Sequence, residues 1–315
     1  MNVAYTKGLH ELGDGLHAYL QPHGGWGWSN AGLITAGGAS MLVDTLFDLK
    51  LTGEMLDSMK PITDADPIEA AMNTHHNGDH CFGNQLLPPG VTIYATPATV
   101  EAMQAAPPQL LTILKGLEDP ELGGFARRIF GPFEFEGIEL RLPTETYEGR
   151  LELRLGGREV IFTELGPAHT ASDSIAHVPD AGVVFTGDLL FVGGTPIAWD
   201  GTIQNWFDAC EHILSLGAHT LVPGHGPVTD ASGVRELVRY LSYVRDEARA
   251  RFEGGMDAVA AADDIDLSDF AEWSDPERIA VNVEAVYREL DPQCPAASPA
   301  ELFARMARWS ASHSR

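Results

Sequence analysis

Histidine and aspartate residues follow short apolar runs at four separate places in the chain, and this feature constrains the fold more than any other. The four stretches are IEAAMNTHHNGDH, FTELGPAHTASD, VVFTGDLLF and HTLVPGHGPV, each with a glycine nearby. Side chains that follow strands meet at one edge of a layered α/β structure. We therefore expect six side chains to converge there: His75, Asp79, His80, His169, Asp188 and His225.

Imidazole and carboxylate groups are the usual protein ligands of zinc and similar divalent metals. A single histidine after a strand is more often a structural residue with satisfied hydrogen bonds. Four such places in one chain favour a metal site over the competing interpretation, a purely structural hydrogen-bonded cluster. Zinc is the expected metal.

Strands alternate with helices in the predicted secondary structure of the first 230 residues, which indicates a layered α/β domain. Apolar runs broken by glycine and proline predict strands at 16–20, 31–45, 91–96, 151–155, 158–164, 174–179, 182–188 and 219–225. Amphipathic stretches predict helices at 47–61, 96–106 and 205–217. The first of these helices is expected to end at Pro61.

Long amphipathic stretches replace the short strands after residue 230. They predict three helices, at 233–252, 276–290 and 299–312. We therefore divide the chain into a main domain over 1–229 and a helical extension over 230–315, which is short for an independent core. Aromatic side chains of the extension fit packing against the main domain or against the partner in a homodimer; they are Trp273, Tyr287, Phe303 and Trp309.

Charge and composition argue against several classes of partner. A net charge of −25 over 315 residues repels nucleic acid and anionic membranes. No run approaches the roughly 20 apolar residues of a membrane span, and the first 20 residues lack the pattern of a signal peptide. The cysteines Cys81, Cys210 and Cys294 are widely spaced and odd in number, as in a reducing compartment. The sequence thus predicts a cytoplasmic protein with a small-molecule substrate.

The order of four short motifs resembles the metallo-β-lactamase superfamily. A His-x-Asn-x-Asp-His run at 75–80 precedes PAHT, TGD and GHG, and the resemblance covers roughly residues 12–228. It implies an αβ/βα four-layer sandwich with two facing sheets, outer helices and a metal site at one edge. The C-terminal helical extension follows this sandwich.

The resemblance also implies which residues hold which metal. In the family pattern His-x-His-x-Asp-His, the two separated histidines and the PAHT histidine hold the first metal; the corresponding positions are His75, Asn77 and His169. The Asp-His pair and the GHG histidine hold the second metal, and the TGD aspartate bridges both; these are Asp79, His80, His225 and Asp188.

Asn77 departs from the family pattern, because an amide oxygen is a weaker zinc ligand than imidazole. The sequence therefore predicts one firmly bound metal and a second that is weak or absent, with Asn77 at most a weak ligand. Iron and manganese are alternatives to zinc at the more oxygen-rich first site. His76 is a less suitable replacement, because adjacent side chains on a tight loop point in different directions.

The favoured function is metal-dependent hydrolysis of an ester, thioester, lactone or amide carbonyl. A metal held by the second-site ligands lowers the pKa of its bound water, and the resulting hydroxide attacks the carbonyl. Asp79 and Asp188 are the candidate catalytic residues, because either carboxylate can accept a proton or orient the water. A catalytically silent metal-binding scaffold is a further alternative, which only Asn77 favours.

A finer resemblance points to a different reaction. The stretches 23–34, 73–87, 165–170 and 276–290 are similar to actinobacterial metallo-β-lactamase-fold polyketide cyclases. This similarity implies a cyclase or lyase in which the metal polarises a ketone and stabilises an enolate. Independently of it, Trp26 and Trp28 lie in a glycine-rich segment before a strand, where they either line an apolar substrate mouth or pack as ordinary aromatic residues.

Overall fold

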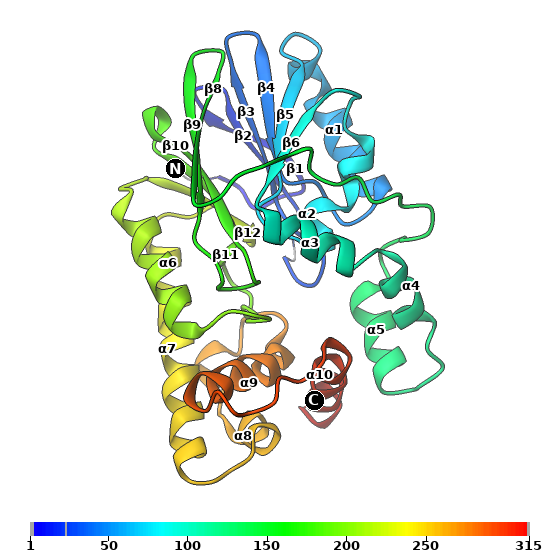
Figure 1. Cartoon of the computed structure of the whole chain (residues 1–315), viewed down its shortest axis with the longest axis vertical. Helices are drawn as coiled ribbons and strands as arrows, with labels where there is room; N and C mark the ends of the chain where they lie inside the picture. Colours follow the sequence, from blue (N-terminus) through cyan, green and yellow to red (C-terminus); the bar gives the residue numbers. More distant parts are fainter. Residues whose placement is uncertain (1–2, 23, 314–315) are drawn as a thin grey trace.

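Two β-sheets face each other in the computed structural model, which describes residues 3–22 and 24–313. His23, the first residue of one family-like stretch, lies outside the described residues. Helices cover the outer faces of the sheets, and further helices form the lower part of the molecule in Figure 1. The architecture is the four-layer α/β sandwich with a C-terminal helical region that the sequence predicts.

The larger sheet has the strand order β1-β2-β3-β4-β5-β6-β7. Strands β1 to β4 pair antiparallel, whereas β4 to β7 pair parallel. Their bounds are Gly8–Gly13, Leu16–Leu20, Ala31–Ala36, Ala39–Val43, Ile68–Met72, Thr92–Ala95 and Glu145–Thr146. The predicted strand segment 31–45 is a hairpin, because Gly37 and Gly38 turn the chain with φ angles of 58° and 88°.

The smaller sheet has the strand order β12-β11-β10-β9-β8, with only β11 and β12 parallel. From β8 to β12 the strand bounds are Arg150–Leu155, Arg158–Glu164, Ser174–Val178, Val183–Phe191 and Thr220–His225. Alternate residues of both sheets, such as Ile34, Met41 and Phe162, form the buried core between them. Gly32 permits this close packing, because a Cβ there would collide with the Phe185 ring.

Helices of the main domain cover the sheets and their edges. From α1 to α6 the bounds are Leu49–Thr63, Gly78–Cys81, Pro97–Ala105, Gln109–Gly116, Leu122–Phe130 and Ile203–Ser215. The prediction that the first helix ends at Pro61 is wrong, because proline in the last turn removes one hydrogen bond without preventing that of Asp64 N–H to the Lys60 carbonyl, 3.0 Å. Helices α4 and α5 were not predicted, since prolines precede the first and two glycines lie in the second.

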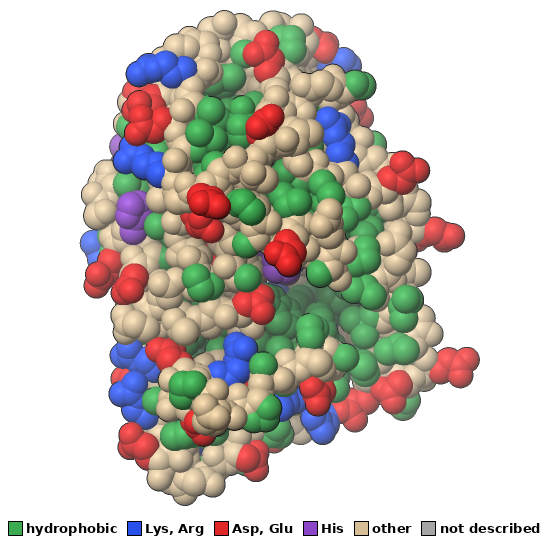
Figure 2. Space-filling model, viewed as in Figure 1, with side chains coloured by type: hydrophobic (Ala, Val, Ile, Leu, Met, Phe, Trp, Pro, Cys, Tyr) green, Lys and Arg blue, Asp and Glu red, His purple; other side chains and the backbone are tan. Residues whose placement is uncertain are grey.

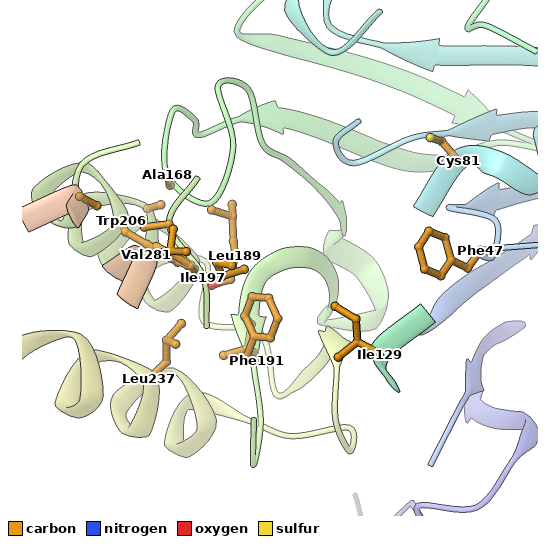
Figure 3. Close-up of a cluster of buried hydrophobic side chains, with 14 of the residues drawn as sticks. Phe47, Cys81, Ile129, Ala168, Leu189, Phe191, Ile197, Trp206, Leu237 and Val281 are labelled. Atoms are coloured by element: carbon orange, nitrogen blue, oxygen red, sulfur yellow. Dashed lines mark hydrogen bonds between the residues drawn. The ribbon is translucent and has the colours of Figure 1, made fainter. Parts of the chain in front are cut away.

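The C-terminal extension contains four α-helices among its described residues, one more than predicted. Helices α7 to α10 span Ala231–Glu253, Ala258–Asp264, Ile279–Leu290 and Pro299–His313. Helix α7 packs on α6 and β11, while α10 packs on α5. Figure 3 shows Leu237 of α7 and Val281 of α9 in one apolar cluster with Trp206 of α6. The extension therefore shares its core with the sandwich.

The aromatic residues of the extension have partners within the same chain. Phe303 lies 5.9 Å from Trp26 of the main domain between ring centroids, and Trp273 stacks on Tyr240. A homodimer remains a prediction that these contacts do not require. Within the described ranges, no helix combines the length and the apolar character of a membrane span.

We expect a chain that ends at residue 230 to lose its stable fold. The truncation uncovers large apolar side chains such as Trp206, and each costs about 1.5–3 kcal/mol against a usual stability of about 5–15 kcal/mol. Thermal unfolding and soluble yield measure the effect. A chain that lacks only α10 is the control, and it should retain the sandwich because the main contacts of α10 are with α5, α8, α9 and the turn Pro276–Arg278 and not with the sheets. A fully stable chain of residues 1–230 would contradict the shared core.

Candidate metal centre

Six buried side chains converge where five segments meet: the loop after β5, the short helix α2, the loop between β9 and β10, strand β11 and the end of β12. They form two groups of possible metal ligands, in each of which the ligand atoms all lie within 4.8 Å of one another. The groups are His75, His169 and Asp188, and Asp79, His80 and His225. The structure thus places all six predicted residues in one centre, divided as the family pattern implies.

Asp188 lies between the two groups. Its Oδ2 is 3.4 Å from the Nε2 atoms of both His169 and His225 and 3.9 Å from that of His75. Its Oδ1 is 3.1 Å from His80 Nε2. One carboxylate therefore faces four imidazoles, as the predicted bridging position requires.

Glycines on the two parallel strands make room for this carboxylate. Asp188 lies inside β11, where the pairing with β12 shifts register. Gly187 adopts a φ of 51°, which favours glycine, and a side chain at Gly224 would collide with the Asp188 carboxylate. The TGD and GHG motifs thus need their glycines to bring Asp188 and His225 together.

Hydrogen bonds at Nδ1 aim the Nε2 atoms of the histidines into the centre. His169 Nδ1 is 2.6 Å from the Ile197 carbonyl oxygen, and His225 Nδ1 is 3.1 Å from that of Gly24. A carbonyl can only accept, so in both rings Nδ1 carries a proton, and Nε2 is the nitrogen that presents a lone pair when the ring is neutral. This tautomer suits a metal ligand.

Asp44 orients the other two histidines, and our sequence analysis missed it. Its carboxylate is 2.9 Å from His80 Nδ1 and accepts hydrogen bonds from the backbone N–H and the hydroxyl of Thr74. That hydroxyl in turn lies 3.0 Å from His75 Nδ1. Asp44 directly follows the buried strand β4, and its φ of 64° is unusual for a residue other than glycine.

Asp173 holds the loop that carries His169, and it too was missed. Its carboxylate accepts hydrogen bonds from the backbone N–H groups of Ala168 and Thr170 and from the Thr170 hydroxyl at 2.7 Å. Burial raises the pKa of Asp173 to about 7 despite these bonds. The aspartate in PAHTASD is therefore a loop-positioning residue.

Without a metal, the histidines of the two groups have pKa values that are shifted in opposite directions. Burial lowers the pKa of the His225 imidazole, but the carboxylates of Asp188 and Asp79 more than compensate and raise it to about 9. The same balance of burial and carboxylates raises the pKa of His80 well above its usual value. Burial lowers the pKa of His169 to about 4 and, together with His80, lowers that of His75 well below its usual range.

The carboxylates of the centre remain ionised. Burial acts to raise the pKa of Asp188, but His225 and His80 hold it well below its usual value. Burial also opposes ionisation of Asp79, whose pKa His80 and His225 lower. Both candidate catalytic carboxylates thus carry a negative charge and can accept hydrogen bonds.

Asn77 adds a polar atom with no hydrogen-bond partner. It precedes α2 as its N-cap residue, yet its side chain makes no capping bond. Its Oδ1 is buried and unpaired among the described residues, as are Nε2 of His75 and of His169. His76 is half-buried and belongs to neither ligand group.

Trp26 and Trp28 are half-buried and pack against other aromatic rings, which is one of the two roles that the sequence suggests. Trp26 packs edge-on against Phe130, and Trp28 lies 4.8 Å from Phe133 between ring centroids. Both also line a cavity of about 600 Å³, whose other walls include α5 and α10. None of the six ligand residues lines this cavity, so a role for the two tryptophans in substrate binding remains a prediction.

The residues fit a divalent metal. Buried imidazole nitrogens without hydrogen-bond partners, at His75 and His169, are costly unless they meet a ligand. The second group combines two imidazoles with the ionised carboxylates of Asp79 and Asp188. His75, His169 and Asp188 would hold one ion, and Asp79, His80, His225 and Asp188 the other.

We expect metal binding at the second group to release about two protons at pH 7, because His80 and His225 must lose theirs to coordinate. Binding at the first group should release none, since His75 and His169 are already neutral. Affinity at the second group should therefore rise with pH up to about 9. Calorimetric titrations in buffers of different protonation enthalpy measure the release, and equal release at both groups would contradict the assignment.

Comparisons with known proteins show which proteins the chain is similar to. Hydroxyacylglutathione hydrolase of Dictyostelium discoideum is 25% identical over 177 residues, 54% of this chain and 52% of that protein. The Brucella ovis protein of the same name is 28% identical over 176 residues, 51% of this chain and 54% of that protein. The chain thus spans about half the length of these curated relatives.

Solved structures share the fold. The sec-alkylsulfatase Pisa1 from Pseudomonas sp. matches 93% of this chain and 52% of its own, with a TM-score of 0.67 and 18% identity. A metallo-beta-lactamase from Pontibacter korlensis matches 73% of this chain and 96% of its own, with a TM-score of 0.55 and 19% identity. The family model of the metallo-beta-lactamase superfamily matches residues 24–225, which hold all six ligand residues. The chain belongs to the metallo-β-lactamase superfamily.

Proposed function

We propose that the chain is a metal-dependent hydrolase that cleaves an ester, thioester, lactone or amide carbonyl of a small organic molecule. The observation that carries the proposal is the pair of buried ligand groups joined by Asp188. When bound, a divalent metal would supply a Lewis acid that activates water and polarises a carbonyl oxygen.

The protein's own groups support such chemistry by accepting protons and holding geometry. Asp79 and Asp188 remain ionised, so either carboxylate can accept a proton from an attacking water or orient it. The bonds of His169 and His225 to backbone carbonyls fix both rings before substrate arrives. Such preorganisation avoids reorganisation during the reaction.

Thioesters are the first substrates to test. The name of the relatives describes hydrolysis of hydroxyacylglutathione, and an acyl group joined to the glutathione sulfur is a thioester. Figure 2 shows a hollow in the middle of the molecule, bordered largely by hydrophobic side chains and with a histidine at its upper edge. This border suits an apolar acyl group better than a highly charged one.

A cyclase or lyase would rely on the same residues as a hydrolase, but it would form a different product. Hydrolysis adds the mass of water to the substrate, whereas a cyclisation by condensation loses it. The silent-scaffold reading predicts no turnover at all. Mass analysis of products therefore separates the three readings.

We expect hydrolysis of an S-acylglutathione or an aryl ester to depend on His225. The His225→Ala variant loses a ligand of the second group and should fall at least about 100-fold in kcat/KM, as should chelator-treated protein. His212→Ala is the matched control, because that histidine lies on α6 and belongs to neither ligand group. Equal turnover by the chelator-treated and the native protein would contradict a metal-dependent reaction.

We also propose that one metal binds firmly at the second group and another weakly at the first, with zinc as the firm metal. Two carboxylates serve the second group, whereas the first has only Asp188, which it shares. The unpaired Oδ1 of Asn77 is an uncharged oxygen atom that could serve as a further metal ligand of the first group. An oxygen ligand would favour a harder metal such as manganese or iron.

Replacing Asn77→His should raise the affinity for a second metal, because imidazole is the stronger zinc ligand. Elemental analysis after dialysis should give about one metal per native chain and about two per variant chain, on the ligand count of each group. His76→Ala is the control, and its metal content should equal that of the native chain. Two equally tight metals in the native protein would show that the first group is already complete.

A further inference from the structure

A short segment of the C-terminal extension joins two loops of the metal centre. Ser274 exchanges backbone hydrogen bonds with the loop after β11, to Gly193 at 3.2 Å and from Thr195 at 3.0 Å. Glu277 accepts a hydrogen bond of 2.9 Å from the indole of Trp26, two residues after Gly24. The segment 274–278 thus contacts both loops at once.

Arg278 is the buried centre of this junction, with 2% of its surface exposed. Its guanidinium carbon lies 4.2 Å from the centroid of the Trp26 ring and 5.6 Å from that of Phe191. The same group donates a hydrogen bond of 2.8 Å to the Thr195 carbonyl and lies 3.2 Å from the Asp275 carboxylate. Because it is so fully enclosed, Arg278 is not available to a substrate.

The two loops that Arg278 joins are those that hold His225. The ring of Phe191 stacks on the His225 imidazole, with centroids 5.2 Å apart and an interplanar angle of 1°. Gly24 accepts the Nδ1 hydrogen bond of the same imidazole, and Val192 N–H donates to the His225 carbonyl at 3.0 Å. Figure 3 shows Phe191 among the buried side chains of the core cluster.

We propose that Arg278 is a positioning residue that fixes the His225 imidazole through Phe191 on one side and through the Gly24–Trp26 loop on the other. The proposal rests on the role of His225 as a metal ligand. Outer residues that orient a coordinating histidine sustain metal affinity, because the ring must point its lone pair at the ion. The C-terminal extension would then be part of the metal centre without supplying a ligand.

The local geometry favours arginine at this position. A planar guanidinium can stack on Trp26 while its N–H groups reach the Thr195 carbonyl and Asp275, whereas an ammonium group cannot do all three. Asp275 adopts a φ of 56°, which is uncommon for a residue other than glycine. A Cβ built on Gly25 would lie 3.2 Å from its carboxylate, so Gly25 is also in close contact with this junction.

The test measures zinc affinity by competition with a chromophoric chelator, which needs no substrate. The Arg278→Met variant should bind the firm zinc about ten-fold more weakly than the native protein, at the lower end of the effect of outer residues. Arg278→Lys should recover part of this loss, because its ammonium keeps the charge beside Trp26 and Asp275. Arg305→Met is the matched control, since it breaks another ion pair of the extension, with Glu284, away from His225.

A second variant keeps the proposal testable if Arg278→Met does not fold. Phe191→Leu retains apolar volume but removes the ring that stacks on His225, so it should weaken zinc binding similarly. Thermal unfolding of the metal-free variants shows whether they remain folded. Native zinc affinity in both variants, or an equal loss in Arg305→Met, would overturn the proposal. Absence of hydrolytic activity in the native protein would contradict the proposed function but leave this result unaffected.

Discussion

The candidate metal centre depends on the contacts of the Asp188 carboxylate with the imidazoles around it. It is buried and faces imidazoles from three other segments of the chain, two of them at 3.4 Å from Oδ2. A buried carboxylate is costly unless positive charge or a metal compensates it. The register shift in β11, the positive φ of Gly187 and the missing side chain at Gly224 all make this placement possible. The smaller sheet therefore positions this charge, and histidines that come from both sheets surround it.

The C-terminal extension belongs to the same structural unit as the sandwich. Helix α7 continues the core from α6, and Phe303 of α10 joins the aromatic cluster around Trp26. Arg278 connects this cluster with Phe191, whose ring lies on His225. Packing in the extension and geometry at the metal centre are thus linked through a few aromatic rings, although the extension supplies none of the six ligands.

The six candidate ligands could be predicted from the sequence because each lies within or just after an apolar run in a recognisable motif. Asp44 could not, because a lone aspartate after a strand has no histidine beside it to mark its role. Arg278 could not either, since its contact with the His225 region joins residues that are distant in the chain. Helix α5 was not predicted because Gly123 and Gly124 lower the helix propensity of its sequence. The end of α1 was predicted too early because Pro61 lies in its last turn. Short motifs therefore indicated the candidate ligands, whereas the residues that orient them became apparent only from contacts between distant segments.

The two ligand groups differ in the carboxylates that surround their histidines, independently of Asn77. Asp79 and Asp44 both lie beside His80, and Asp79 also lies beside His225, whereas His75 and His169 share only Asp188. The two pairs of histidines therefore have pKa values shifted in opposite directions before any metal binds. A histidine at position 77 would add a nitrogen donor to the first group but no negative charge. The distribution of carboxylates, fixed by the end of β4 and by helix α2, would still favour a cation at the second group.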